Sequence, residues 1–162
     1  MRRSPVGASP EAVAAALGQG GEGVRLELVK ALRGKDKVAA ERAARGLKKI
    51  AEADRAALYG LRKELLKEAF RAADVRVQWN LTIVLGRLPL AGRDKAAVVD
   101  LMFERLGDAS GLNRTMAMQA LMDLSENDAA LRARVTPIVR EALETGSPAM
   151  RARAKRLLKQ VR

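Results

Sequence analysis

A helical pattern recurs about every 37 residues along this chain, and this repeat limits the possible fold more than any single residue does. Four leucines mark it at intervals of 38, 36 and 37 residues: Leu47, Leu85, Leu121 and Leu158. Each has an apolar residue four positions before it and three positions after it, the spacing of one face of an α-helix. A period of about 20 to 50 residues is typical of stacked repeats, whose units cannot bury their apolar faces alone.

A second apolar pattern precedes each of these segments, so each repeat is expected to contain two helices. We expect the first helices at about 24–33, 55–72, 94–107 and 129–145, and the second at about 37–53, 75–89, 111–126 and 148–161. The prediction is an all-α fold with repeats at about 24–53, 55–89, 94–126 and 129–161, within one domain over 24–162. Residues 1–23 are expected to form a short helix and a glycine-rich connector.

The N-terminal helix is expected to begin at Ser9-Pro10-Glu11, where a hydroxyl can cap the helix and proline suits its first position. The glycine-rich segment Gly18–Gly23 after it matches the G-x-G-x-x-G pattern of dinucleotide sites. That motif needs a strand before it and a helix after it. Because a helix is expected before it, a flexible connector is the favoured interpretation and a phosphate-binding loop the alternative.

Composition excludes many kinds of chemistry. The chain contains no cysteine and no histidine, so disulfides, thiolate catalysis, Cys/His zinc sites and imidazole acid–base catalysis are absent. Its aspartates cluster near expected helix ends, where capping and turn roles are usual: Asp74, Asp94, Asp108, Asp123 and Asp128. We therefore expect a protein that is not an enzyme and needs no cofactor or metal.

The N-terminus raises the question of export. Arg2 and Arg3 precede an alanine-rich stretch, but Pro10 and Glu11 interrupt it and the apolar run over 12–17 is too short for a signal peptide. No segment approaches the roughly 18 apolar residues that a membrane span requires. We expect a soluble, cytoplasmic protein that does not bind membranes.

The last repeat carries the clearest family signature. The segment Thr136–Leu143, with Pro137 near its start, is followed by a turn at Gly146-Ser-Pro and by a helix that opens with Met150-Arg151. Together these resemble one HEAT repeat, a family with a proline-kinked first helix and a second helix that opens with an apolar residue and arginine. The resemblance implies a right-handed α-solenoid of about four HEAT-like repeats, a curved scaffold that binds proteins or nucleic acids without chemistry of its own.

Earlier repeats show this opening less completely. Asp74-Val75-Arg76 and Asn113-Arg114 echo it, whereas Ala39-Ala40 lacks the arginine. One subset of HEAT-like proteins, the DNA alkylation-repeat glycosylases, holds a damaged nucleotide with several aromatic residues and an aspartate. Here Trp79 is the single tryptophan and Ile83 lies one turn beyond it, so glycosylase activity is disfavoured.

Positive charge is concentrated at the two ends of the chain. The net charge is +12. Residues 1–73 contain 16 basic and 9 acidic residues, residues 74–131 contain 6 and 8, and residues 132–162 contain 9 and 2. A partner that recognises the second helices would therefore meet basic ends and a less charged centre.

Positions away from the leucines on the second helices, taken as exposed, supply the candidate binding residues. These are Arg42, Arg45, Lys48 and Lys49; Trp79, Asn80 and Ile83; Arg114, Met116 and Gln119; and Arg151, Arg153, Lys155 and Arg156. Trp79 lies about 180° from the apolar stripe of its helix. The central apolar residues could anchor a partner or fill the junction between repeats, and the basic clusters could bind a partner or form solvated helix faces.

Two classes of partner fit these candidates. We expect a non-catalytic scaffold that binds an acidic protein or peptide, with the apolar centre as anchor and the basic ends steering association. The alternative is a protein that binds the backbone of duplex DNA through lysine and arginine. Single-stranded nucleic acid is disfavoured because only Trp79 and Tyr59 could stack with bases.

Overall fold

The computed structural model of the chain describes residues 22–161. All regular structure in this range is helical, with eight α-helices and one short 3-10 helix, so the predicted all-α fold is confirmed. The helix expected from Ser9, and the segment Gly18–Gly21 of the expected connector, lie outside the described residues.

The described chain divides into two compact units, one ending at Pro89 and one beginning at Leu90. The helices of the first unit are α2 (Glu22–Arg33), α3 (Lys37–Ala53), η2 (Tyr59–Leu61), α4 (Arg62–Arg71) and α5 (Val75–Arg87). Those of the second unit are α6 (Gly92–Arg105), α7 (Gly111–Leu124), α8 (Ala129–Thr145) and α9 (Pro148–Lys159). A single domain over 24–162 stays a prediction.

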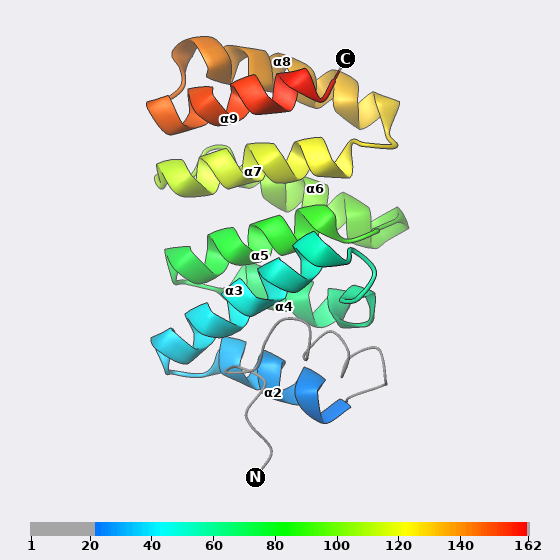
Figure 1. The fold of residues 1–162 in the computed structure, drawn as a ribbon, viewed down its shortest axis with the longest axis vertical. Helices are drawn as coiled ribbons and strands as arrows, with labels where there is room; N and C mark the ends of the chain where they lie inside the picture. Colours follow the sequence, from blue (N-terminus) through cyan, green and yellow to red (C-terminus); the bar gives the residue numbers. More distant parts are fainter. Residues whose placement is uncertain (1–21, 162) are drawn as a thin grey trace. The chain divides into compact units, whose positions relative to one another are not determined.

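The first unit consists of two helical hairpins, α2 with α3 and α4 with α5 (Figure 1). The hairpins pack chiefly through α3 against α5, and α2 also contacts α4. Both second helices begin at an aspartate cap: Asp36 accepts hydrogen bonds from the backbone N–H groups of Val38 and Ala39, and Asp74 caps α5 in the same way. These caps satisfy backbone donors that would otherwise lack partners.

The second unit also consists of two hairpins, α6 with α7 and α8 with α9. α7 contacts α6, α8 and α9, and is the central helix of this unit. Side chains of Ser110, Asp128 and Ser147 cap α7, α8 and α9 respectively. Pro148 occupies the first turn of α9, where its missing N–H costs no hydrogen bond.

The repeated leucines supply core positions in both units. Leu47, Leu85 and Leu121 are fully buried, whereas Leu158 is half-buried. The apolar residues four positions before these leucines are buried in all four segments: Ala43, Leu81, Ala117 and Ala154. The sequence repeat therefore predicts the buried faces of α3, α5 and α7, and that of α9 in part.

The helix bounds differ from expectation at a few ends. The helix expected from residue 55 begins only at η2, because Asp54 ends α3 and accepts a hydrogen bond from the backbone N–H of Ala56. α2 already includes Gly23, which was expected in the connector. α8 continues through Pro137 as one helix.

Candidate partner-binding faces

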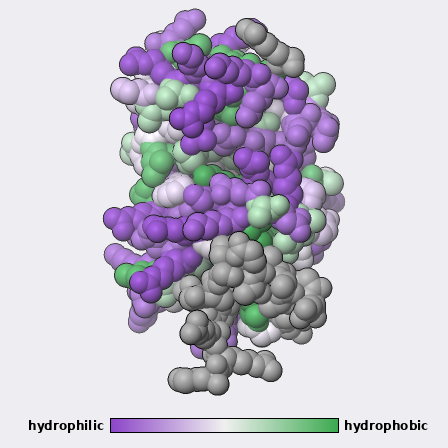
Figure 2. Space-filling model, in the orientation of Figure 1, coloured by the Kyte–Doolittle hydropathy of each residue, from purple (hydrophilic) through white to green (hydrophobic). Residues whose placement is uncertain are grey.

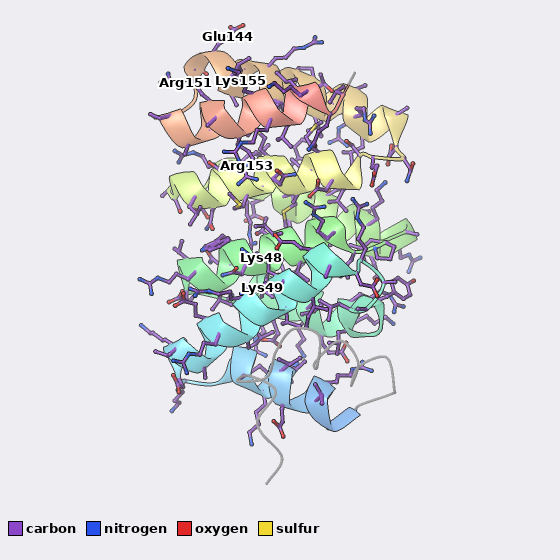
Figure 3. The ribbon with its side chains drawn as sticks, viewed as in Figure 1. Lys48, Lys49, Glu144, Arg151, Arg153 and Lys155 are labelled. Atoms are coloured by element: carbon purple, nitrogen blue, oxygen red, sulfur yellow. The ribbon has the colours of Figure 1, made fainter. Side chains whose placement is uncertain are left out.

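Two basic surfaces emerge from the second helices of the hairpins, one in each unit. We define the α3–α5 face as Arg42, Arg45, Lys48 and Lys49 of α3 with Arg76 and Trp79 of α5. We define the α9 face as Arg151, Lys155, Arg156 and Lys159. Figure 3 shows Lys48 and Lys49 on α3, and Arg151 and Lys155 on α9. Figure 2 shows mainly hydrophilic residues over both helices.

A carboxylate ties the arginines of the α3–α5 face together. Glu41, on α3, accepts hydrogen bonds from Arg45 over 2.7 Å and from Arg76 over 3.1 Å. Arg76 belongs to α5, so this bridge joins the two helices that form the main contact of the first unit. One acid therefore offsets part of the positive charge of this face.

The indole of Trp79 lies beneath a lysine on the same face. The side chain is half-buried, and Lys48 Nζ lies 4.8 Å from the centre of its ring. At this distance an ammonium group is attracted by the negative face of the aromatic ring. Trp79 is therefore neither a core residue nor a freely exposed one.

Two valines add apolar surface on the same sides of these helices. Val38 is 58% exposed near the start of α3, and Val75 is 41% exposed at the start of α5. At 100° per residue, Val38 falls on the same side of α3 as Arg45 and Val75 on the same side of α5 as Trp79. The α3–α5 face therefore combines positive charge with exposed or partly exposed apolar groups.

On the α9 face, no carboxylate of the described residues offsets the positive charge. α9 contains no acidic residue, and the four cations of the face are exposed. Within residues 22–161 none of the four forms an ion pair or a side-chain hydrogen bond. No large apolar side chain of α9 is exposed. This face therefore presents cations alone.

Arg153, a candidate from the sequence, has an internal role instead. It is half-buried and donates to Gln119 Oε1 on α7 over 3.1 Å. Gln119 in turn donates to Asp123 over 2.9 Å. Figure 3 shows Arg153 between α9 and α7. The side chain therefore connects two packed helices and does not extend the α9 face.

Four of the central residues taken as exposed are buried, which favours the alternative that the apolar ones fill interior space. Asn80, Ile83, Met116 and Gln119 are only 0%, 8%, 6% and 7% exposed. Met122, another possible junction residue, is buried as well. The apolar residues of α7 lie all around its circumference, and a helix of this kind is normally buried. The polar members have internal partners, since Asn80 donates to the carbonyl of Arg76.

Arg114 supports a turn. Its guanidinium donates to the carbonyl oxygens of Asp108 and Ala109 before α7. The pKa of the Asp108 carboxyl is lowered, first by a hydrogen bond from the backbone N–H of Ser110 and then by one from the side chain of Asn113. Asp108 and Arg114 therefore fix the α6–α7 connection from both sides.

Among the described residues, each unit contains a hollow, and the two are similar in size. One of about 340 Å³ lies in the second unit beside Lys95, Asp128 and Arg134. Lys95 donates to Asp128 over 2.7 Å and lowers the pKa of this carboxyl. The other, of about 350 Å³, lies in the first unit beside Arg33, Arg71 and the buried Glu68. Asp128 and Glu68 are already paired with cations, and neither lining offers a nucleophile with a base.

Glu41, beside the α3–α5 face, and Arg76, within it, were missing from the sequence-based candidates, whereas Lys159 extends the basic cluster already expected on the last helix. Glu41 lies four residues before Arg45, the spacing of a helical ion pair, and that signal could have identified it. Arg76 belongs to the Asp74-Val75-Arg76 opening, but its bridge to α3 required the structure. Lys159 lies four residues beyond Lys155 on the same side of α9.

No protein-family model matches this chain, and comparison with curated proteins finds no match either. Among the helices of residues 22–161, none has both the length and the apolar composition of a membrane span. In the same range no group of three or more acidic side chains is placed to hold a metal ion.

Proposed function

We propose that this protein is a non-catalytic binding scaffold, and that its α3–α5 face binds an acidic segment of another protein. The observation that carries this proposal is the placement of Trp79, half-buried beneath Lys48 among the arginines of α3 and α5. The HEAT-like pattern of the sequence supports a right-handed α-solenoid of about four repeats as the scaffold.

Protein interfaces of moderate affinity depend on a few large anchors, among which tryptophan and arginine are enriched. The α3–α5 face contains one tryptophan and three arginines, all on the two helices through which the hairpins of the first unit chiefly pack. Acidic residues of the partner would pair with Arg42 and Lys49, which form no ion pair within the described residues. Charge complementarity of this kind increases association rates and fixes the orientation of the complex.

Lys48 has a particular part in this proposal. Its ammonium group covers the indole, an interaction worth about 0.5–1 kcal/mol at an exposed site. A carboxylate of the partner would attract Lys48 away from the ring. The uncovered indole would then contact an apolar side chain of the partner, next to Val75.

Trp79 is also the single tryptophan of the chain, so its fluorescence reports on this face directly. The test is to titrate the protein with a helical peptide that carries acidic residues around a pair of leucines. We expect a change in Trp79 emission and saturable binding. K48Q and R42Q should weaken binding of the labelled peptide, measured by anisotropy.

The matched control is K63Q on α4, which removes an exposed lysine of the same unit outside the face. It should leave peptide affinity unchanged at moderate salt. The proposal fails if the peptide does not bind, or if K63Q weakens binding as much as K48Q does.

A further inference from the structure

Some charges of the α9 face destabilise the helix that carries them. Cations near a helix C-terminus are favourable, and Arg156 and Lys159 lie in the last turn of α9. Arg151 lies only four residues after the cap Ser147, close to the positive end of the helix dipole. The first turn contains no acid to offset it. The helix dipole therefore favours Arg156 and Lys159 and disfavours Arg151.

Repulsion between neighbouring cations also destabilises α9. Arg151 and Lys155, and then Lys155 and Lys159, are four residues apart, a spacing at which like charges destabilise a helix. The acids of residues 132–162 are Glu141 and Glu144, near the end of α8. Within the described residues neither forms an ion pair with α9. The face keeps a stability cost that internal contacts do not offset.

The side chains of this face also indicate what it binds. The centre of a protein–protein interface is depleted in charge and enriched in aromatic residues. Interfaces with DNA are more polar and much more positively charged. α9 presents cations and no exposed large apolar side chain. We propose that the α9 face binds the backbone phosphates of double-stranded DNA.

Charge density favours the duplex over a single strand. From Arg151 to Lys159 the helix rises about 12 Å, and a duplex presents roughly seven phosphate charges over that length. α9 has no aromatic residue on which the bases of a single strand could stack. Because the contacts are to phosphate alone, binding is independent of base sequence.

The experiment measures the affinity of the full chain for a labelled DNA duplex at two salt concentrations. Four phosphate contacts predict that binding weakens roughly 100-fold between about 50 and about 200 mM salt. The double variant R151Q/K155Q keeps two contacts, so its binding should weaken only roughly 10-fold over the same range.

The matched control is K63Q/K67Q, which removes two exposed lysines from α4 and lowers the net charge equally. It should retain the salt dependence of the unaltered protein. Circular dichroism should show that both double variants fold, because all four positions are exposed and glutamine is a good helix former.

Several results would overturn the proposal. These are no duplex binding at low salt, an equal salt dependence in both double variants, equally tight binding of a single strand, and equally tight binding of poly-glutamate of the same charge. The proposal is independent of the acidic-peptide interaction, because R151Q/K155Q leaves the α3–α5 face intact. Peptide binding by this variant separates failure of one proposal from failure of the other.

Discussion

The two basic faces carry similar charges but differ in what surrounds them. On the α3–α5 face, Glu41 bridges Arg45 and Arg76, and Lys48 covers Trp79. On the α9 face, the four cations have neither a carboxylate nor an aromatic ring as partner within the described residues. Side chains of the α3–α5 face thus take part in contacts between two helices of their unit, whereas those of the α9 face are directed to solvent.

This difference shows that a count of basic residues does not describe a binding surface. On the α3–α5 face, Arg45 and Arg76 are paired with Glu41 and Lys48 covers Trp79, so the number of cations overstates the charge available to a ligand. Those of α9 contribute little to stability and repel one another. Substitutions should therefore destabilise the first unit and leave the second unchanged or stabilised.

The largest effect is expected for Trp79→Ala. Truncation of a core tryptophan costs about 3–5 kcal/mol, and because Trp79 is half-buried we expect a loss of about 2–3 kcal/mol in the free energy of unfolding. Urea denaturation measures this loss in the free energy of unfolding. The matched change on the other face, Arg151→Ala, should stay within about 0.5 kcal/mol. Equal losses in the two variants would remove the distinction between the faces.

A smaller loss is expected for Glu41→Gln. Two arginines lose their carboxylate partner, and exposed ion pairs contribute about 0.2–1 kcal/mol each. We expect a destabilisation of about 1 kcal/mol at low salt, which decreases as salt screens the pairs. Denaturation at two salt concentrations tests this. A loss independent of salt would show that charge is not the cause.

A gain in stability is expected for Lys155→Glu. The new carboxylate lies four residues from both Arg151 and Lys159, and such pairs contribute about 0.2–0.5 kcal/mol each. Removal of two repulsions adds a similar amount, so we expect a gain of about 1 kcal/mol and a rise in Tm of roughly 2–4 °C. DNA binding should weaken in the same variant, because the α9 face loses one cation and gains a negative charge. A lower Tm would contradict the view that α9 is strained by its own charge.

The smallest effect concerns Asp108, which together with Arg114 holds a turn. Its carboxyl has a pKa below the ordinary 3.8 because the N–H of Ser110 and the side chain of Asn113 donate to it. A lowered pKa in the folded state adds stability above the unfolded-state pKa, and this stability is lost as pH falls through the folded pKa. Asp108→Asn should be less stable than the unaltered protein at about pH 7. The difference should narrow below about pH 4; a constant difference would exclude this carboxylate as the cause.

The sequence alone predicts most of the helices and the buried leucines. It does so because apolar spacing, aspartate and serine caps and glycine turns are local signals. The main error at helix starts came from Asp54, whose side chain holds a turn before η2. The helices α5, α7 and α9 end two residues earlier than expected.

The candidate site was harder to predict, because exposure depends on contacts between helices. The repeat pattern predicts one buried face for α7. The apolar side chains of this helix lie all around its circumference, however, and Met116 and Gln119 are buried. Arg153 resembles its basic neighbours in sequence, yet it reaches Gln119 on another helix. Only the positions of neighbouring helices distinguish such a residue from Arg151 or Lys155.

The most direct test of the central claim follows individual lysines by NMR after methylation of their amines with isotope-labelled groups, a change that keeps the positive charge. In the free protein, the signal of Lys48 should be displaced by the ring of Trp79, and this displacement should vanish in Trp79→Phe. On addition of a DNA duplex, the signals of Lys155 and Lys159 should move first and recover as salt is raised. An unshifted Lys48, or movement of Lys48 and Lys49 before those of α9, would contradict the division of roles between the two faces.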